Sequence, residues 1–253
     1  MTTVSAPDVV SRSRIADDSP ALLQVAGLAK RYGEQRALAD ISFAVHTGEV
    51  LGLIGPNGAG KTTLMEAIAG LLPLDSGEVL WRGTPLPLAR RRELMFYLPD
   101  GLRPWEEQYV ADVIGFFADV YGKPESIVAT TIRTLGLADV LRKRVHALSK
   151  GFARRLMLAL ALITPQPLLL MDEPFDGFDL RQTREIMGVL REVAASGRTL
   201  VLAIHQLGDA ERICDRFVLL ADGRVSGQGT LDQLRAQGGK PAASLGDVFL
   251  ALT

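Results

Sequence analysis

One stretch of eight residues combines the residue types that bind phosphate groups. Gly55-Pro56-Asn57-Gly58-Ala59-Gly60-Lys61-Thr62, followed by Thr63, matches G-x-x-x-x-G-K-[ST] at every fixed position. Glycines let the backbone curl so that its N–H groups point at phosphate oxygens, and a following helix adds the positive end of its dipole. We expect Lys61 to reach the β- and γ-phosphates of a nucleotide and Thr62 to place its hydroxyl on Mg²⁺.

A pair of acidic residues supplies the second half of such a site. The apolar run 168–171 predicts a buried strand, and Asp172 and Glu173 stand at its carboxyl end, where open α/β sheets bind ligands. We expect Asp172 to hold Mg²⁺ and Glu173 to orient or deprotonate an attacking water. Two acids at a strand end are common in solvated turns, so this interpretation depends on the glycine-rich loop upstream.

Strands and helices must alternate along the chain to position these residues. Short apolar runs predict strands at 22–25, 41–45, 49–54, 78–81, 94–98, 168–171, 199–204 and 217–220. Helical periodicity follows Lys61 and recurs at 110–120, 149–163, 186–193, 231–234 and 245–250. The break at 122–125 separates the helix at 110–120 from a further helix that runs through Ile132. The alternation predicts an α/β fold with a mostly parallel sheet, interrupted by a helical insertion at about 105–150.

The composition excludes several classes of protein. Hydrophobic residues make up 47% and charged residues 23% of the 253 residues, which excludes wholesale disorder. The net charge of -1 gives no support to a nucleic-acid binder, and the single cysteine excludes an intramolecular disulfide and a cysteine-built metal site. No stretch approaches the roughly 20 apolar residues of a membrane span, and no secretory signal is visible. We expect a cytosolic protein with a flexible tail at residues 1–20.

With both motifs placed, the chain from about residue 21 to its end resembles the nucleotide-binding subunit of ATP-binding cassette (ABC) transporters. Leu148-Ser149-Lys150-Gly151-Phe152 stands where the family has its signature LSGGQ, and Gly177-Phe178-Asp179 resembles its D-loop. His205 follows the predicted strand 199–204 and matches the family's switch histidine, which touches the γ-phosphate. Tyr32 resembles the aromatic residue that stacks on adenine.

The resemblance implies a P-loop NTPase fold with an N-terminal antiparallel β region. It implies one nucleotide-binding domain over 21–253, with a helical subdomain at about 105–150, that binds ATP and Mg²⁺. It also implies a dimer, with a homodimer expected, in which Ser149 and Gly151 of one copy close on the γ-phosphate held by the other. Glu173, His205 and Lys61 are then the catalytic residues.

The sequence departs from the family pattern in three places. Lys150 replaces the first glycine of the signature and Phe152 its polar last residue, a variant similar to those of the exporter-like (ABC-2 type) branch. Phe175-Asp176-Gly177-Phe178 replaces the more usual Thr-Ser-Gly-Leu. Asp100 stands where the family usually has a glutamine that contacts Mg²⁺ and couples to the membrane subunit. Its oxygen could still ligate the metal, although it adds negative charge.

By resemblance, the chain is an ATPase that powers transport by a separate membrane-embedded subunit, in the direction of export. It would sit peripherally on the cytoplasmic face of the cell membrane without inserting into it, and the insertion and the Asp100 loop would dock the partner. Two alternatives stay open: a non-transport ABC ATPase, and a scaffold that binds ATP without turnover. Glu173 and His205 argue against the scaffold, and neither cargo nor membrane subunit follows from the sequence.

Overall fold

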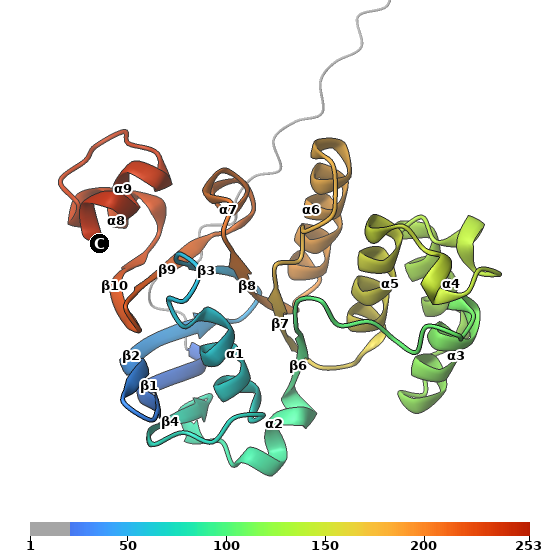
Figure 1. The fold of residues 1–253 in the computed structure, drawn as a ribbon, viewed down its shortest axis with the longest axis horizontal. Helices are drawn as coiled ribbons and strands as arrows, with labels where there is room; N and C mark the ends of the chain where they lie inside the picture. Colours follow the sequence, from blue (N-terminus) through green and yellow to red (C-terminus); the bar gives the residue numbers. More distant parts are fainter. Residues whose placement is uncertain (1–20) are drawn as a thin grey trace, which may run out of the picture.

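The computed structural model describes residues 21–253, so the tail expected at residues 1–20 lies outside the described residues. Two sheets lie next to each other, and a lobe of helices projects at one end of the molecule (Figure 1). The strands are β1 (Ala21–Tyr32), β2 (Gln35–His46), β3 (Val50–Ile54), β4 (Ser76–Trp81), β5 (Thr84–Pro85), β6 (Met95–Leu98), β7 (Leu168–Asp172), β8 (Thr199–Ile204), β9 (Arg216–Ala221) and β10 (Arg224–Gly229). The helices are α1 (Lys61–Ala69), α2 (Leu88–Leu94), α3 (Val110–Val120), α4 (Glu125–Thr134), α5 (Lys150–Ile163), α6 (Leu180–Ala195), α7 (Leu207–Ile213), α8 (Leu231–Gln237) and α9 (Leu245–Leu252), with 3₁₀ turns at Ala138–Val140 and Val145–Ala147.

The larger sheet has six strands in the order β10-β9-β3-β8-β7-β6. All neighbouring pairs are parallel except β10 and β9, which confirms the mostly parallel sheet. Every residue of β3, β7 and β8 is buried. Successive side chains of these strands enter two different cores, one shared with α5 and α6 and one shared with α1 and the smaller sheet. This double cover explains the continuous apolar runs in the sequence.

The smaller sheet is antiparallel and has the order β2-β1-β4-β5. Its apolar side chains join the core around α1, so this sheet covers the helix that follows the glycine-rich loop. The N-terminal antiparallel region is thereby confirmed. β10, α2 and α7 were not predicted, because their sequences lack strong periodicity. β10 (RVSGQG) obtains its place by pairing with β9.

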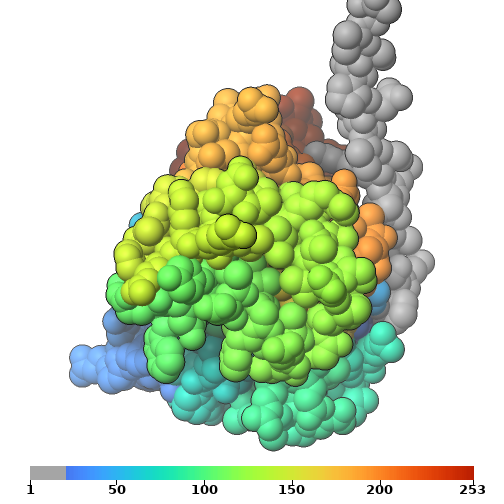
Figure 2. Space-filling model, turned by 90° about the vertical axis from the view of Figure 1, so that its right-hand side faces the viewer, coloured from blue at the N-terminus to red at the C-terminus, as the bar shows by residue number. Residues whose placement is uncertain are grey.

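The helices between β6 and β7 form the projecting lobe. α3 and α4 lie within the predicted insertion, and apolar residues of both pack against α5 in one core. Figure 2 looks onto this face of the molecule, where the segment coloured green to yellow forms most of the visible surface. The helix α5 therefore joins the lobe to the sheet, because residues 164–167 lead from its end directly into β7.

Arg198 fastens the beginning of β8 to the end of α5. Its side chain donates to the carbonyl oxygens of Leu162 at 3.0 Å and of Gln166 at 2.9 Å and 3.1 Å. Burial lowers the pKa of Arg198 to about 10, so the group remains charged at neutral pH. The carbonyl groups at the carboxyl end of α5 carry partial negative charge, which this cation satisfies.

We expect Arg198→Met to lower the free energy of unfolding by about 2–4 kcal/mol, because it leaves buried carbonyl oxygens without donors. Urea denaturation of the full chain measures this. Arg181→Met is the control, since the Arg181 side chain is 90% exposed, and its effect should stay within about 0.5 kcal/mol. Equal effects of the two variants would contradict the role of Arg198.

Candidate functional site

The glycine-rich loop connects the carboxyl end of β3 to the beginning of α1. Gly60 has a φ of +100°, and a Cβ there would lie 2.7 Å from the carbonyl oxygen of Ala37. A Cβ at Gly55 would lie 2.5 Å from the carbonyl oxygen of Leu220. Both distances are below normal contact, so these positions accept only glycine without a shift of the neighbouring backbone. The tight curl of the loop is thus enforced by the strands around it.

Lys61 folds back over the loop that precedes it. Its Nζ donates to the carbonyl oxygens of Gly55 at 2.6 Å and of Pro56 at 3.2 Å. Burial lowers the pKa of Lys61, and the nearby charges of Glu173 and Asp172 oppose that shift. The ammonium group therefore lies inside the cradle, where it can contact phosphate oxygens.

Thr62 and Asp172 place two oxygen atoms beside the loop. Thr62 Oγ1 donates to Asp172 Oδ2 at 2.6 Å. Asp172 is buried, which raises its pKa, while the hydrogen bond from Thr62 lowers it. A hydroxyl and a carboxylate at a helix N-terminus are the hard oxygen donors that Mg²⁺ takes beside a phosphate chain. The donor set therefore fits this metal.

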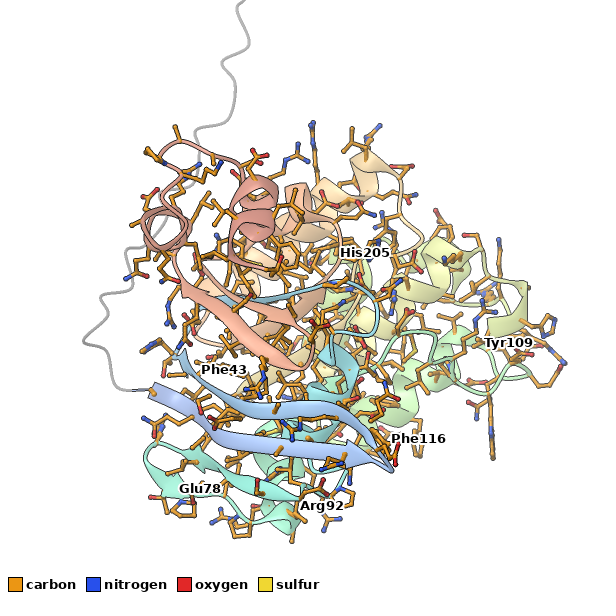
Figure 3. The ribbon with its side chains drawn as sticks, turned by 60° about the vertical axis from the view of Figure 1, so that its left-hand side comes forward. Phe43, Glu78, Arg92, Tyr109, Phe116 and His205 are labelled. Carbon is orange, nitrogen blue, oxygen red and sulfur yellow. The ribbon has the colours of Figure 1, made fainter. Side chains whose placement is uncertain are left out.

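Glu173 and His205 meet because β7 and β8 are parallel neighbours. Asp172 pairs with Ala203 in the sheet, so the residues that follow the two strands emerge side by side. Glu173 Oε2 and His205 Nδ1 lie 2.6 Å apart, and the Glu173 N–H donates to the Ala203 carbonyl at 3.0 Å. Burial raises the pKa of Glu173, and the hydrogen bond from His205 lowers it. His205 is labelled in Figure 3.

An open cleft of about 470 Å³ unites most of the predicted site. Its lining contains the glycine-rich loop, both acids of the β7 end and residues of the smaller sheet: Tyr32, Gln35, Ala37, Pro56, Asn57, Gly58, Gly60, Lys61, Thr62, Thr63, Asp100, Asp172 and Glu173. Tyr32 is 48% exposed at the rim, and the Lys30 ammonium lies 5.6 Å from the centroid of its ring. The glycine cradle, the lysine and the two oxygen donors fit the phosphate chain of a nucleotide with Mg²⁺.

Ser149 and Gly151 lie apart from this lining in the described part of the chain. Ser149 caps α5, where its Oγ accepts a hydrogen bond from the Phe152 N–H at 3.3 Å. A Cβ at Gly151 would lie 3.4 Å from the carbonyl oxygen of Gly177, so this segment contacts the D-loop-like turn. Lys150 and Asp176 form an ion pair of 2.8 Å. Two of the departures from the family pattern therefore compensate each other's charge.

Two residues of this region were not predicted from the sequence. Arg154 is buried and donates to both Asp100 Oδ1 and the Glu173 carbonyl oxygen. Tyr97 places its hydroxyl near the acids of the site, without a hydrogen-bond partner among residues 21–253, and burial raises its pKa. No local pattern identifies either residue, because their partners are distant in sequence.

Comparisons with known proteins agree with this geometry. The family model of the ABC transporter matches residues 38–176, more than half of the chain. The chain therefore belongs to the ABC transporter family. Among residues 21–253, no helix has the length and apolarity that a membrane crossing requires.

Similar proteins cover most of the chain. An uncharacterized ABC transporter ATP-binding protein of Methanocaldococcus jannaschii is 30% identical over 216 residues, covering 84% of this chain and 79% of that protein. The Nod factor export ATP-binding protein I of Ralstonia nicotianae is 36% identical over 226 residues, covering 85% and 69%. A solved ATP-binding subunit of an ABC transporter aligns with a TM-score of 0.84 and 34% identity, covering 91% of this chain and 99% of that one.

These matches confirm the predicted family, the P-loop NTPase fold and the ATPase class. The chain is an ATP-binding, ATP-hydrolysing subunit of an ABC transporter. Subunits of this kind work with transmembrane partners. The roles of individual residues stay predictions.

The backbone contact at Gly60 can be tested against a neighbouring glycine. Gly58 also has a positive φ, of +84°, but a Cβ there meets nothing within 4 Å. We expect Gly58→Ala to cost about 1 kcal/mol of unfolding free energy from its φ alone. Gly60→Ala should cost about 2 kcal/mol more, because its Cβ meets the Ala37 carbonyl. Denaturation of the nucleotide-free chain measures both, and equal losses would contradict this account.

Proposed function

We propose that this chain hydrolyses ATP in the cleft around Lys61 and so powers export through a membrane-embedded partner, as one of two identical subunits. The observation that carries the chemistry is the 2.6 Å contact between Glu173 and His205 beside the phosphate-binding loop. Export is supported by the names of relatives, among them Nod factor export ATP-binding proteins and a linearmycin resistance ATP-binding protein of Bacillus subtilis.

Glu173 is the proposed general base. A partly buried carboxylate with a raised pKa is a better proton acceptor than a solvated one, and Glu173 lines the cleft. His205 orients this carboxylate through its Nδ1 and keeps its other ring nitrogen for the γ-phosphate. Water activation and charge stabilisation thus come from two residues that one hydrogen bond couples.

The remaining cleft residues bind and orient the nucleotide. Lys61 and the N–H groups of residues 55–63 hold the β- and γ-phosphates, and Tyr32 stacks on the base. Thr62 and Asp172 hold Mg²⁺, which when bound neutralises charge on the phosphate oxygens. Asp100 lines the same cleft, but its Oδ1 accepts a hydrogen bond from Arg154, so we assign the metal to Thr62 and Asp172.

The position of the signature segment supports a dimer. Ser149 and Gly151 lie outside the cleft of their own chain, at the beginning of α5, where a helix N-terminus favours negative charge. In a pair of copies this helix end would close on the γ-phosphate held by the partner. The cleft of one copy would then be incomplete alone, so that hydrolysis depends on assembly.

The helical lobe is the proposed docking region for the membrane partner. We assign residues 21–253 to one nucleotide-binding domain, with a helical subdomain at about 105–150. The lobe and the loop before it expose large apolar side chains, including Trp105 at 80% and Phe116 at 64%; Figure 3 labels Phe116. Such exposure favours a protein contact. Docking there would hold the chain peripherally on the cytoplasmic face of the membrane.

We expect Glu173→Gln to lower kcat for ATP hydrolysis by about 10²–10⁴-fold, because the amide cannot accept the proton of water. ATP binding should change by less than about threefold, because the phosphate cradle is intact. Phosphate release and calorimetric titration with ATP measure the two effects. Glu93→Gln is the control, as Glu93 is exposed on α2 and pairs with Arg90. Unchanged turnover in Glu173→Gln would exclude Glu173 as the base.

Purification of the tagged full chain from detergent-solubilised membranes tests the partner. We expect a transmembrane protein to co-purify in stoichiometric amount, and Trp105→Asp to lose it, because a charge opposes burial of that surface. Leu250→Asp is the matched control: Leu250 is 77% exposed on α9, which lies on the opposite side of the molecule from α3 (Figure 1). Equal retention in both variants would contradict docking through the lobe.

A further inference from the structure

A buried arginine joins the nucleotide cleft to the helix that follows the signature segment. Arg154 lies on α5, and its side chain is only 7% exposed. Its Nη2 donates to Asp100 Oδ1 at 2.5 Å and to the Glu173 carbonyl oxygen at 2.7 Å. One guanidinium group therefore connects the two loops that follow β6 and β7, and both loops line the cleft.

The contact with Glu173 fixes a peptide that needs support. Glu173 has a φ of +47°, a left-handed conformation that residues other than glycine rarely adopt. Four contacts hold it there: its N–H donates to Ala203, its carboxylate contacts His205, and its carbonyl accepts from Arg154 and, at 3.1 Å, from the Asp176 N–H. Because backbone orientation sets the direction of the side chain, loss of the Arg154 contact would leave the carbonyl with the Asp176 N–H alone and loosen the position of the Glu173 carboxylate.

The contact of Arg154 with Asp100 neutralises a negative charge beside the phosphate-binding loop. The Asp100 side chain is 49% exposed and lines the cleft together with the phosphate-binding loop. A carboxylate at this place repels the phosphates of a nucleotide, and the repulsion is screened only in part. The Arg154 guanidinium neutralises it at hydrogen-bond distance.

We propose that Arg154 is a positioning residue with two separable effects. It orients Glu173 through the backbone carbonyl, and it neutralises Asp100 so that the phosphates of ATP can bind beside that carboxylate. The inference rests on the proposed function, because it takes Glu173 as the base and this cleft as the nucleotide site.

The adjacent arginine provides a matched control. Arg155 is 13% exposed and likewise contacts one carbonyl and one carboxylate, the Leu135 oxygen at 3.1 Å and Glu185 Oε2 at 3.1 Å. Leu135 belongs to the helical lobe and Glu185 to α6, and the Arg155 guanidinium also lies 5.7 Å from the centroid of the Phe178 ring. Among the described residues, these partners are not part of the cleft lining. Arg154→Met and Arg155→Met thus remove comparable groups at different places.

The experiment compares variants of the full chain by kcat for ATP hydrolysis and by Kd for Mg²⁺-ATP. Calorimetry gives the Kd in a Glu173→Gln background, where ATP is not consumed. Arg154→Met should lower kcat about tenfold or more and raise Kd about threefold or more, with a larger rise at low salt. Adding Asp100→Asn should restore the Kd while kcat stays low. Arg154→Lys should recover kcat in part, and Arg155→Met should leave both values within about twofold.

Three results would overturn the proposal. Arg154→Met could behave like Arg155→Met, its Kd could stay that of the wild type, or Asp100→Asn could restore kcat together with Kd. Denaturation of each variant identifies any that fails to fold. Arg154→Gln, whose side-chain amide keeps an N–H donor for the Glu173 carbonyl oxygen, then replaces Arg154→Met. If Glu173→Gln alone keeps wild-type turnover, the proposed function fails. If Glu173→Gln abolishes turnover and Arg154→Met does not reduce it, only the present inference fails.

Discussion

Parallel pairing of β3, β8 and β7 is the constraint on which the nucleotide cleft depends. Leu53 and Asp172 both pair with residue Ala203 of β8, so the three strands end at one edge of the sheet. The phosphate-binding loop, the acids of β7 and His205 each follow one of these strands. The backbone hydrogen bonds between the strands already bring these three chain segments together. Side-chain contacts such as that between Glu173 and His205 are therefore not needed to assemble the cleft.

Burial of these strands on both faces also sets the electrostatics at their ends. Little solvent reaches Lys61 and Asp172. Burial lowers the pKa of Lys61 and raises the pKa of Asp172, and both shifts favour the neutral form of the side chain. Opposite charges nearby counter these shifts, so the cleft holds a cluster of groups that stabilise one another. Phosphates and a divalent cation enter such a cluster as additional charges, and preoriented groups stabilise them more strongly than water would.

The departures from the family signature are also explained by charge. Lys150 and Asp176 pair with each other, and Lys150 holds the pKa of Asp176 below its usual range. Both side chains are substantially exposed, so the pair contributes at most about 1 kcal/mol and orients the two loops more than it stabilises the fold. Asp100 and Arg154 form a second pair at the cleft. Each unusual acid thus lies beside a base that neutralises it.

The sequence by itself determined the parts of the protein that are contiguous in the chain. The phosphate-binding loop is readable because its glycines, lysine and threonine act together within one turn, and the buried strands are readable because cover on both faces makes them apolar throughout. Their order along the chain, together with the family resemblance, then indicated Asp172, Glu173 and His205 as candidate site residues.

Only the tertiary structure decided which side chains from distant segments touch. Arg154 contacts residues 54 and 19 positions away, and Glu173 contacts His205 across 32 positions. Short elements such as α7 and β10 likewise depend on the neighbours against which they pack. The physical reason is that periodicity reports which face of an element is buried, whereas the partner on that face is set by the packing of the whole chain.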